Sequence, residues 1–316
     1  MSATHAASLD ERALRAALAF AAGHGLRCDE PVVMRAASNL LVRLAPAPVV
    51  ARVSTVTATV RDGDAWFARE VAIASHLVAA GAPVVAPSAE VDPGPHRHDG
   101  LTLSFWTYVD EADRPLDAHE AGRRLRLCHE ALTSFPGELP RWAVLDEAQH
   151  ALEHLRTRGA LDADDAALLR RAGERARARI DGLGLALQAI HGDAHLHNVI
   201  NGHDGPLWND WEDCFLGPRA WDLGCMRAST AAFGDDPLPV SAALAGYGDA
   251  VGDAAIDACA EGRRFQGTVW SFVMAAHQPE RHARAQERLA WYRERDGPAP
   301  PPLSAWPRPP GPPSAP

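Results

Sequence analysis

The sequence has no lysine, so all 31 of its basic residues are arginines. Any site that needs a cationic side chain must therefore use arginine or histidine. Acidic residues outnumber basic ones 41 to 31, which gives a net charge of −10, and a chain of this charge repels nucleic acid overall. We expect no nucleic-acid partner. The segment "RRAGERARARI" (170–180) contains Glu174 and follows Asp-rich sequence, so we interpret it as an exposed helix face.

Long apolar runs and paired cysteines are also absent. No run of about 18 or more apolar residues occurs, and the opening "MSATHAASLDERALR" has neither the basic region nor the apolar region of a signal peptide. We expect no membrane partner and a cytoplasmic location. The five cysteines are scattered without CxxC spacing, which argues against a disulfide framework and against a structural zinc site.

The first third of the chain reads as a small α+β lobe. Residues 9–25 have helical periodicity and end at a glycine, and residues 31–54 contain three short Val- and Leu-rich runs that predict three antiparallel strands. Residues 62–81 predict a helix and residues 101–110 a further strand. This order predicts a sheet with a helix on one face.

Helical patterns dominate beyond Asp117, interrupted by short strands and loops around residues 191–224. With 316 residues, 47% of them apolar, the chain is long enough for two lobes. We assign residues 1–108 to an N-terminal lobe and residues 109–297 to a C-terminal lobe. Residues 298–316 contain ten prolines, and we expect a disordered tail there.

The stretch "HGDAHLHNVINGHDGPLWNDWEDCFLGPRAWDLG" (191–224) holds four His and six Asp or Glu. One interpretation is a zinc site, with His191 and His195 at the helical spacing i, i+4. However, Gly192 and the turn signal at 201–202 interrupt a helix, and the two histidines have no Glu between them. Zinc is therefore the less favoured alternative.

Oxygen ligands give the second interpretation of the same stretch. The segment "NVINGHDGPLWNDW" reads as strand, turn, strand, which would bring Asn198 and Asp210 together across a hairpin. One carboxylate and one amide oxygen, completed by substrate phosphates and water, suit Mg²⁺. Asp193, at the start of the loop, would then be free to meet a substrate hydroxyl.

Three motifs of this stretch resemble one known family. The loop pattern HGDxHxxN is matched at every fixed position, "NDWED" matches a metal-binding motif, and "GPRAWDLG" matches a later Asp-Leu motif. The sequence thus resembles the aminoglycoside phosphotransferases and related small-molecule kinases. The resemblance implies a two-lobed, protein kinase-like α+β fold, with a small antiparallel-sheet N-terminal lobe and a larger, mainly helical C-terminal lobe. It implies that Asp193 is the catalytic residue and that Asn198 and Asp210 are the magnesium ligands. It also implies supporting roles for His191, His195 and Asp222.

The resemblance extends upstream and covers about residues 31–290. It implies that the N-terminal lobe binds nucleotide, with Ser38 and Asn39 in place of a glycine-rich loop. Arg52 takes the place of the usual strand lysine near the phosphates, and Glu70 is its partner on the following helix. "SFWTYVD" resembles the hinge, where main-chain groups near Thr107 to Val109 would bind the base.

The implied activity is transfer of the γ-phosphate of ATP or GTP to a hydroxyl of a small molecule, with Mg²⁺ as cofactor and the acceptor bound to the C-terminal lobe. A cationic aminoglycoside or another antibiotic would make the protein a resistance enzyme, and the acids of "LDADDA" and "FGDDP" would suit such a cation. The alternative acceptors are metabolites such as an amino sugar, choline or homoserine.

A third alternative is a non-catalytic nucleotide-binding module of the same fold. The complete set of Asp193, Asn198 and Asp210 argues against it, and the missing strand lysine argues for it. A protein kinase is disfavoured because Asp222 follows Asp210 too closely for a long activation segment.

Overall fold

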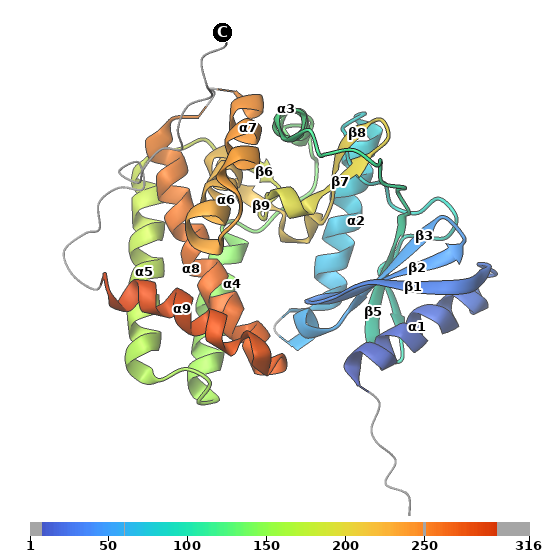
Figure 1. Cartoon of the computed structure of the whole chain (residues 1–316), viewed down its shortest axis with the longest axis horizontal. Coiled ribbons are helices and arrows are strands. Elements are labelled where there is room, and N and C mark those ends of the chain that lie inside the picture. Colours follow the sequence, from blue (N-terminus) through green and yellow to red (C-terminus); the bar gives the residue numbers. More distant parts are fainter. Residues whose placement is uncertain (1–7, 60, 249–250, 296–316) are drawn as a thin grey trace, which may run out of the picture. The chain divides into compact units, whose positions relative to one another are not determined.

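The computed structural model describes residues 8–59, 61–248 and 251–295 (Figure 1). These residues form two compact units. The first contains residues 8–115 and also Ile200–Cys214, and the second contains Leu116–Val199 and residues 215–295. The sequence predicted a single lobe boundary after residue 108. In the structure, the first segment of the first unit continues to Pro115, and a second segment, Ile200–Cys214, returns to the same unit. The expected tail, 298–316, lies outside the described residues.

A five-stranded antiparallel sheet with the strand order β1-β2-β3-β5-β4 forms the first unit's scaffold. The three strands expected within residues 31–54 are confirmed, as is the strand expected at 101–110. The short edge strand β4 was not predicted. The strands are β1 (Cys28–Ala36), β2 (Asn39–Pro46), β3 (Val49–Ser54), β4 (His96–His98) and β5 (Leu101–Thr107).

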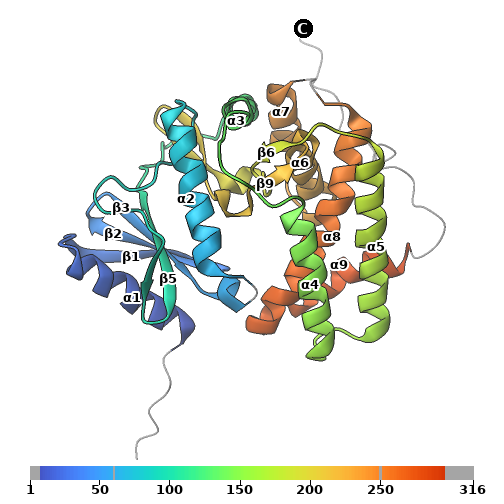
Figure 2. The ribbon, with the colours of Figure 1, turned by 180° about the vertical axis from the view of Figure 1, so that it is seen from behind.

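Two helices flank this sheet, α1 (Leu9–Gly23) and α2 (Gly63–Ala79). The Ser8 side chain caps α1 in a capping box with Glu11. The apolar face of α1 packs on alternate residues of the central strands, such as Val42, Ala51 and Phe105. Because side chains alternate across a strand, Arg52 points to the opposite face, where α2 lies (Figure 2).

The later segment of the first unit is the predicted hairpin, formed by β7 (Val199–Gly202) and β8 (Gly205–Trp208). The Val85 N–H donates to the carbonyl of Trp208 at 2.9 Å, and the Trp208 N–H donates to the carbonyl of Pro83 at 3.0 Å. The Trp208 side chain is fully buried. These contacts anchor the hairpin, and the short helix Trp211–Asp213 that follows it, to the N-terminal part of the chain.

The second unit is mainly helical, as expected. The helix α6 was not predicted, because the sequence indicated short strands and loops around residues 191–224. The helices are α3 (Ala118–Leu132), α4 (Ala143–Thr157), α5 (Ala163–Gly182), α6 (Arg219–Phe233), α7 (Pro237–Tyr247), α8 (Asp253–His277) and α9 (His282–Arg293). Two short strands, β6 (Gln188–Ile190) and β9 (Phe215–Gly217), pair antiparallel. Among the described residues, no helix is both long and apolar enough to cross a membrane.

The helices α6 and α8 pass very close to each other. A Cβ on Gly224 of α6 would lie 2.7 Å from the main-chain nitrogen of Ala260 on α8, and a Cβ on Gly262 would lie 2.9 Å from the Trp221 ring. Such distances exclude larger side chains unless the helices separate. The crossing therefore fixes α8, which carries Arg263, against α6, which carries Asp222.

Candidate active site

The first unit contains a pocket with an apolar end and a charged end. The apolar end can take a flat, weakly polar group, while the charged end offers hydrogen-bond donors and carboxylates. The apolar lining consists mainly of Leu41, Val50, Val85, Trp106, Val109 and Ile200, and the polar lining includes Ser38, Asn39, Arg52, Glu70, Asn209 and Asp210. All of the predicted upstream residues therefore line one pocket.

The main chain of the predicted hinge is only partly available to a ligand. The Thr107 N–H donates to the carbonyl of Ala86 at 2.9 Å, and the Tyr108 N–H donates to the carbonyl of Pro48 at 2.8 Å. An N–H that already has a partner cannot also hold a base at full strength. Within the described chain, the Val109 N–H is the one of these three donors without a partner, and binding of the base by main-chain groups near Thr107 to Val109 stays a prediction.

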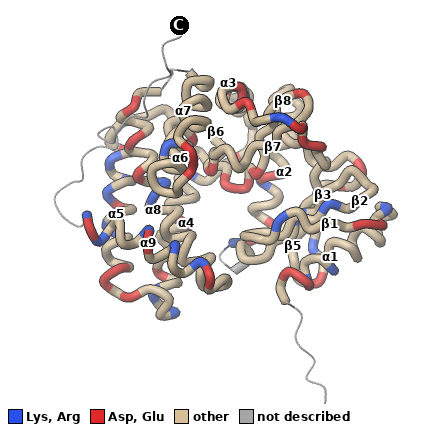
Figure 3. The backbone as a smooth tube through the Cα atoms, in the orientation of Figure 1, with Lys and Arg blue, Asp and Glu red and all other residues tan. Residues whose placement is uncertain are grey.

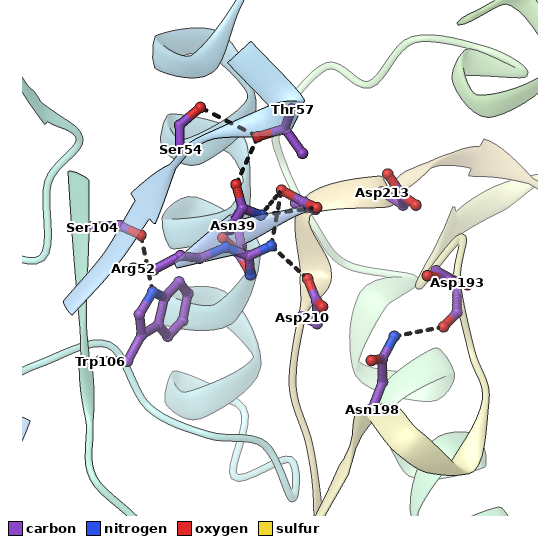
Figure 4. A network of polar contacts seen from close by, with 12 residues as sticks. Asn39, Arg52, Ser54, Thr57, Ser104, Trp106, Asp193, Asn198, Asp210 and Asp213 are labelled. Carbon is purple, nitrogen blue, oxygen red and sulfur yellow. Dashed lines mark hydrogen bonds and ion pairs between the residues drawn. The ribbon is translucent and has the colours of Figure 1, made fainter. Parts of the chain in front are cut away.

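Arg52 lies at the centre of a buried ion cluster (Figure 4). Its Nη1 is 2.8 Å from Oε1 of Glu70, and its Nη2 is 2.7 Å from Oδ1 of Asp210 and 2.9 Å from Oε2 of Glu212. The sequence predicted the pair with Glu70. It did not predict the contacts with the two later acids, because they depend on how the hairpin returns to the sheet.

A second arginine completes the cluster on the other side. Nη1 of Arg61 lies 3.3 Å from Oε1 of Glu212, and Nη2 lies 2.7 Å from Oδ1 of Asp213. The guanidinium also stacks over the Trp66 ring, 3.8 Å from its centroid. Sequence reasoning missed Arg61, since nothing in its surroundings marks it as more than a turn residue.

Negative charge exceeds positive charge in this cluster. When all are ionised, the four carboxylates of Glu70, Asp210, Glu212 and Asp213 outnumber the guanidinium groups of Arg52 and Arg61 by two. A divalent cation would neutralise this excess. The donor set therefore fits a hard cation such as Mg²⁺, which takes one or two protein carboxylates and keeps water or phosphate as its other ligands.

Burial, together with the neighbouring carboxylates, raises the pKa values of two acids in this cluster. Burial raises the pKa of Glu70 to about 8, with Arg52 opposing the shift and Asp210 adding to it. Burial likewise raises the pKa of Glu212 to about 7, against the two arginines. For Arg52, burial alone would lower the pKa, but Asp210, Glu212 and Glu70 together hold it above its ordinary value. Arg52 therefore stays charged.

The backbone at Asp210 is unusual, with φ 65° and ψ 55°. This left-handed conformation is uncommon for residues other than glycine, although aspartate tolerates it better than most. Residues held in such conformations occur often at functional sites. The conformation supports the assignment of Asp210 as a metal ligand.

Asn39 connects Arg52 to the start of the sheet. With its carbonyl oxygen toward Arg52, the Asn39 amide accepts from Nη2 at 2.8 Å and donates to Oγ1 of Thr57 at 2.6 Å. In the opposite orientation, drawn in Figure 4, Nδ2 donates to the Glu212 carboxylate at 3.3 Å. We prefer the first orientation because the second places the amide nitrogen against the guanidinium donors. The neighbouring Ser38 accepts at its carbonyl from Oγ1 of Thr55.

The second unit contains the loop that carries Asp193. Asp222 accepts from the N–H groups of His191 and Gly192, both at 2.8 Å. The buried His129 lies 2.7 Å from the same carboxylate through its Nε2. Gly192 has φ 89°, a conformation that larger residues rarely adopt. The loop is therefore held by its backbone.

Asp193 itself is partly exposed and ionised. Its Oδ1 pairs with Arg263 of α8 and lies 3.5 Å from Nε2 of His195. Burial alone would raise the pKa of Asp193, but Arg263 and His195 hold it below its usual range. Sequence reasoning missed Arg263, which lies on a helix far along the chain. Asp193 is therefore available as a charged hydrogen-bond acceptor for a hydroxyl.

The remaining polar residues of the loop have distinct surroundings. Asn198 is buried and donates from Nδ2 to the main-chain oxygen of Asp193 at 2.9 Å, so its Oδ1 is the atom that could bind a cation. His191 is fully buried, and its Nδ1 accepts from the Asp193 N–H at 3.3 Å. His197 and His203 are exposed and pair with Asp235 and Asp110.

The zinc interpretation gains no support from these positions. In the described ranges, no group of three or more His, Cys, Asp or Glu side chains is arranged to hold a metal ion. Zinc sites in proteins need three or four such ligands. A Mg²⁺ ion that takes most of its ligands from phosphate and water needs no such group.

Asp222→Asn provides a test of how the loop is held. An amide has a single oxygen, so one of the two donors, His191 or Gly192, would face an NH₂ group instead of an acceptor. We expect a lower melting temperature and, for the phosphoryl transfer that the family resemblance implies, a fall in kcat of about tenfold or more. His197→Gln, an exposed change in the same loop, serves as the control. An unchanged kcat in Asp222→Asn would show that these two bonds do not position Asp193.

Comparison with known proteins identifies the chain's relatives. A family model described as "Phosphotransferase enzyme family" matches residues 37–261. The search of curated proteins gives no match.

Solved structures resemble the chain over most of its length. A choline/ethanolamine kinase family protein from Mesorhizobium loti is 19% identical, with a TM-score of 0.59 over 86% of this chain and 90% of that one. Amicoumacin kinase, solved in complex with AMP-PNP, Ca²⁺ and Ami, is 12% identical, with a TM-score of 0.65 over 85% of this chain and 89% of that one. An aminoglycoside phosphotransferase solved with GDP and kanamycin is 16% identical, with a TM-score of 0.59 over 85% and 95%. These likenesses show that the fold is the two-lobed, kinase-like α+β fold.

Proposed function

Because the chain belongs to the phosphotransferase enzyme family and is a small-molecule phosphotransferase, we propose that it transfers the γ-phosphate of ATP or GTP to a hydroxyl group of a small organic acceptor. The observation that carries this proposal is the ionised Asp193, held in the "HGDAHLHN" loop by Asp222 and Arg263. An acceptor hydroxyl donates to this carboxylate, which orients its oxygen for attack and takes its proton late in the reaction.

The pocket of the first unit is the proposed nucleotide site. Its apolar end, with Val50, Trp106 and Val109, would enclose the base, and the Val109 N–H would donate to it. Its charged end, with Ser38, Asn39 and Arg52, would face the phosphates. Arg52 presents a planar set of donors suited to phosphate oxygens, while Glu70 fixes its orientation.

Asp210 and Asn198 are the proposed protein ligands of Mg²⁺. The excess negative charge around Asp210 and the single amide oxygen left on Asn198 support this assignment. When bound, Mg²⁺ neutralises charge on the nucleotide phosphates. The residues of the chain orient the acceptor hydroxyl, hold the phosphates and keep both in position, which is most of what phosphoryl transfer requires of a protein.

The acceptor class is open between two groups of small molecules. One is an aminoglycoside or another antibiotic, which would make the protein a resistance enzyme. The other is a metabolite such as an amino sugar, choline or homoserine. The structural relatives include proteins named for both groups.

The test is a direct search for product. The protein is incubated with Mg²⁺ and ATP or GTP against single acceptors of each group, and mass spectrometry is used to detect an added phosphate. Nucleotide binding is measured separately by calorimetry with AMP-PNP or GDP, with and without Mg²⁺. Nucleotide binding without transfer to any acceptor, and without acceptor-stimulated hydrolysis, would favour a non-catalytic nucleotide-binding module. Failure to bind any nucleotide would refute the proposal.

A further inference from the structure

A second cavity lies wholly within the second unit, among the end of α6, the middle of α8 and α9. Its volume is about 290 Å³. We call it the arginine pocket and define it by six of its lining residues: Phe233, Arg264, Thr268, Arg284, Arg288 and Trp291. Arginine positions, blue in Figure 3, occur on both α8 and α9.

The lining is strongly basic. Arg264, Arg284 and Arg288 line the cavity. Among the described residues that line it, Glu287 is the one acid. Nη2 of Arg284 donates to the carbonyl of Phe233 at 2.9 Å, and Nη1 of Arg288 donates to the carbonyl of Gly267 at 3.0 Å. These are neutral acceptors, so the bonds orient the guanidinium groups without compensating their charge.

Arg264 is the most constrained of the three. Only 4% of this residue is exposed, and its guanidinium carbon lies 4.1 Å from the centroid of the Trp291 ring. Its Nε and Nη2 are buried and have no hydrogen-bond partner among the described residues. A buried guanidinium with two unused donors is costly for the folded state. An anion in the cavity would supply the missing acceptors.

The charges in the pocket also crowd one another. Burial, with smaller contributions from Arg284, Arg263 and Arg281, lowers the pKa of Arg288 to about 10. Like charges held this close repel one another unless a counter-charge lies between them. The protein's overall charge of −10 makes this local excess of positive charge more distinctive.

The pocket is linked to Asp193 through side chains of the second unit. Arg263, which pairs with Asp193, has its guanidinium carbon 5.8 Å from the centroid of the Phe233 ring. The guanidinium carbon of Arg288 lies 4.3 Å from the centroid of the same ring. The arginine that holds the proposed base and an arginine of the pocket therefore lie near the same ring. The pocket and Asp193 are thus neighbouring features of the second unit.

The acids that could have received a cationic acceptor already have other roles. Asp162 caps α5 by accepting from the Asp165 N–H, and Asp165 pairs with Arg293. Asp235 pairs with the exposed His197, and Asp236 caps α7. These four, with Asp164 in the first turn of α5, are the acids of "LDADDA" and "FGDDP" that the sequence offered for an aminoglycoside, and they lie at helix ends or in ion pairs.

We propose that the arginine pocket binds an anionic group of the acceptor, so that the substrate is a hydroxylated carboxylate or phosphate ester. This inference rests on the proposed function for the hydroxyl and its transfer, but the anion site itself does not. Arg264 and Arg288 bind the anionic group, Trp291 and Phe233 contact the carbon skeleton, and the hydroxyl of the same molecule reaches Asp193.

The test uses acceptors matched in shape and different in charge. Glucuronate, glucose and glucosamine form one such series, glycerol 3-phosphate and glycerol form another, and kanamycin represents the polycationic class. We expect phosphate transfer to the anionic members. Arg288→Gln and Arg264→Gln are expected to raise the KM of the anionic acceptor by about tenfold or more with a much smaller change in kcat. Arg126→Gln, which removes an exposed arginine on α3, should leave both constants unchanged.

A second measurement does not depend on catalysis. Glucuronate and glycerol 3-phosphate are titrated by calorimetry into the nucleotide-free protein and into the same variants. Because Arg264 is buried, the melting temperature of Arg264→Gln is recorded. If Arg264→Gln does not fold, the result with Arg288→Gln alone decides the test. The anion site is supported if the anions bind to the parent protein and to Arg126→Gln but not to Arg288→Gln. This result would hold even if the protein bound no nucleotide and the proposed function had failed. Absence of anion binding, or transfer to kanamycin that is insensitive to Arg288→Gln, would overturn the inference.

Discussion

The variant Asp193→Asn is expected to lose phosphoryl transfer by about 10²- to 10⁴-fold, the range typical for removal of a positioned base. Asparagine has nearly the same shape as aspartate but carries no charge and cannot take a proton. The nucleotide pocket, which is formed by residues of the first unit, should bind AMP-PNP as before. The check combines kcat from acceptor-dependent ADP release with the dissociation constant of AMP-PNP from calorimetry.

The control for this variant must account for Arg263. Removal of the Asp193 charge leaves that largely buried guanidinium without its carboxylate partner, so some loss of thermal stability is expected as well. Asp193→Asn combined with Arg263→Gln removes both charges and should recover melting temperature but not kcat. A kcat within a few-fold of the parent in Asp193→Asn would show that this carboxylate is not the base.

The variant Arg52→Met is expected to lower the free energy of unfolding by about 3–5 kcal/mol, because it leaves buried carboxylates without their cation. Arg52 contacts Glu70, Asp210 and Glu212 at 2.7–2.9 Å, and methionine replaces none of these contacts. Nucleotide affinity and kcat should fall together, because the same guanidinium is the proposed phosphate ligand. Urea denaturation and AMP-PNP calorimetry measure the two effects.

Arg97→Met is the matched control in the same unit. It breaks an exposed ion pair, Arg97 with Asp64, and such pairs contribute about 0–1 kcal/mol. If Arg52→Met were as stable as Arg97→Met, the ion cluster would not support the fold of the first unit. If Arg52→Met lost stability but bound nucleotide normally, Arg52 would be a structural residue and the phosphates would be bound elsewhere.

The sequence could predict those parts of the site that lie close together along the chain. The loop around Asp193, the hairpin before Asp210 and the Asp222 motif fall within one short stretch, and each has a recognisable pattern of residues. The strands of the first unit were also predictable, because their apolar runs are separated by clear turn signals. The pair of Arg52 with Glu70 followed from the family resemblance, which implied a cation on one strand and its acidic partner on the next helix.

Other parts of the site depend on contacts between distant segments. Arg263 and His129 lie on helices whose sequences resemble any amphipathic helix, and only packing brings them to Asp193 and Asp222. The acids of "LDADDA" looked available for a cationic acceptor because the sequence did not show where α5 begins or that Arg293 lies opposite Asp165. The short strands β6 and β9 have too few residues to show an alternating pattern.

The two-segment construction of the first unit has a consequence for how the protein is made. On the ribosome, the strands and helices up to residue 115 emerge first, while Trp208 and Asp210 follow only after the whole of Leu116–Val199 has been synthesised. Until then Arg52 lacks the carboxylate of Asp210, and the main chain at Pro83 and Val85 lacks its partner Trp208. The nascent first unit therefore remains incomplete for much of translation, and any nucleotide pocket that requires Asp210 forms only after the catalytic loop has also been synthesised.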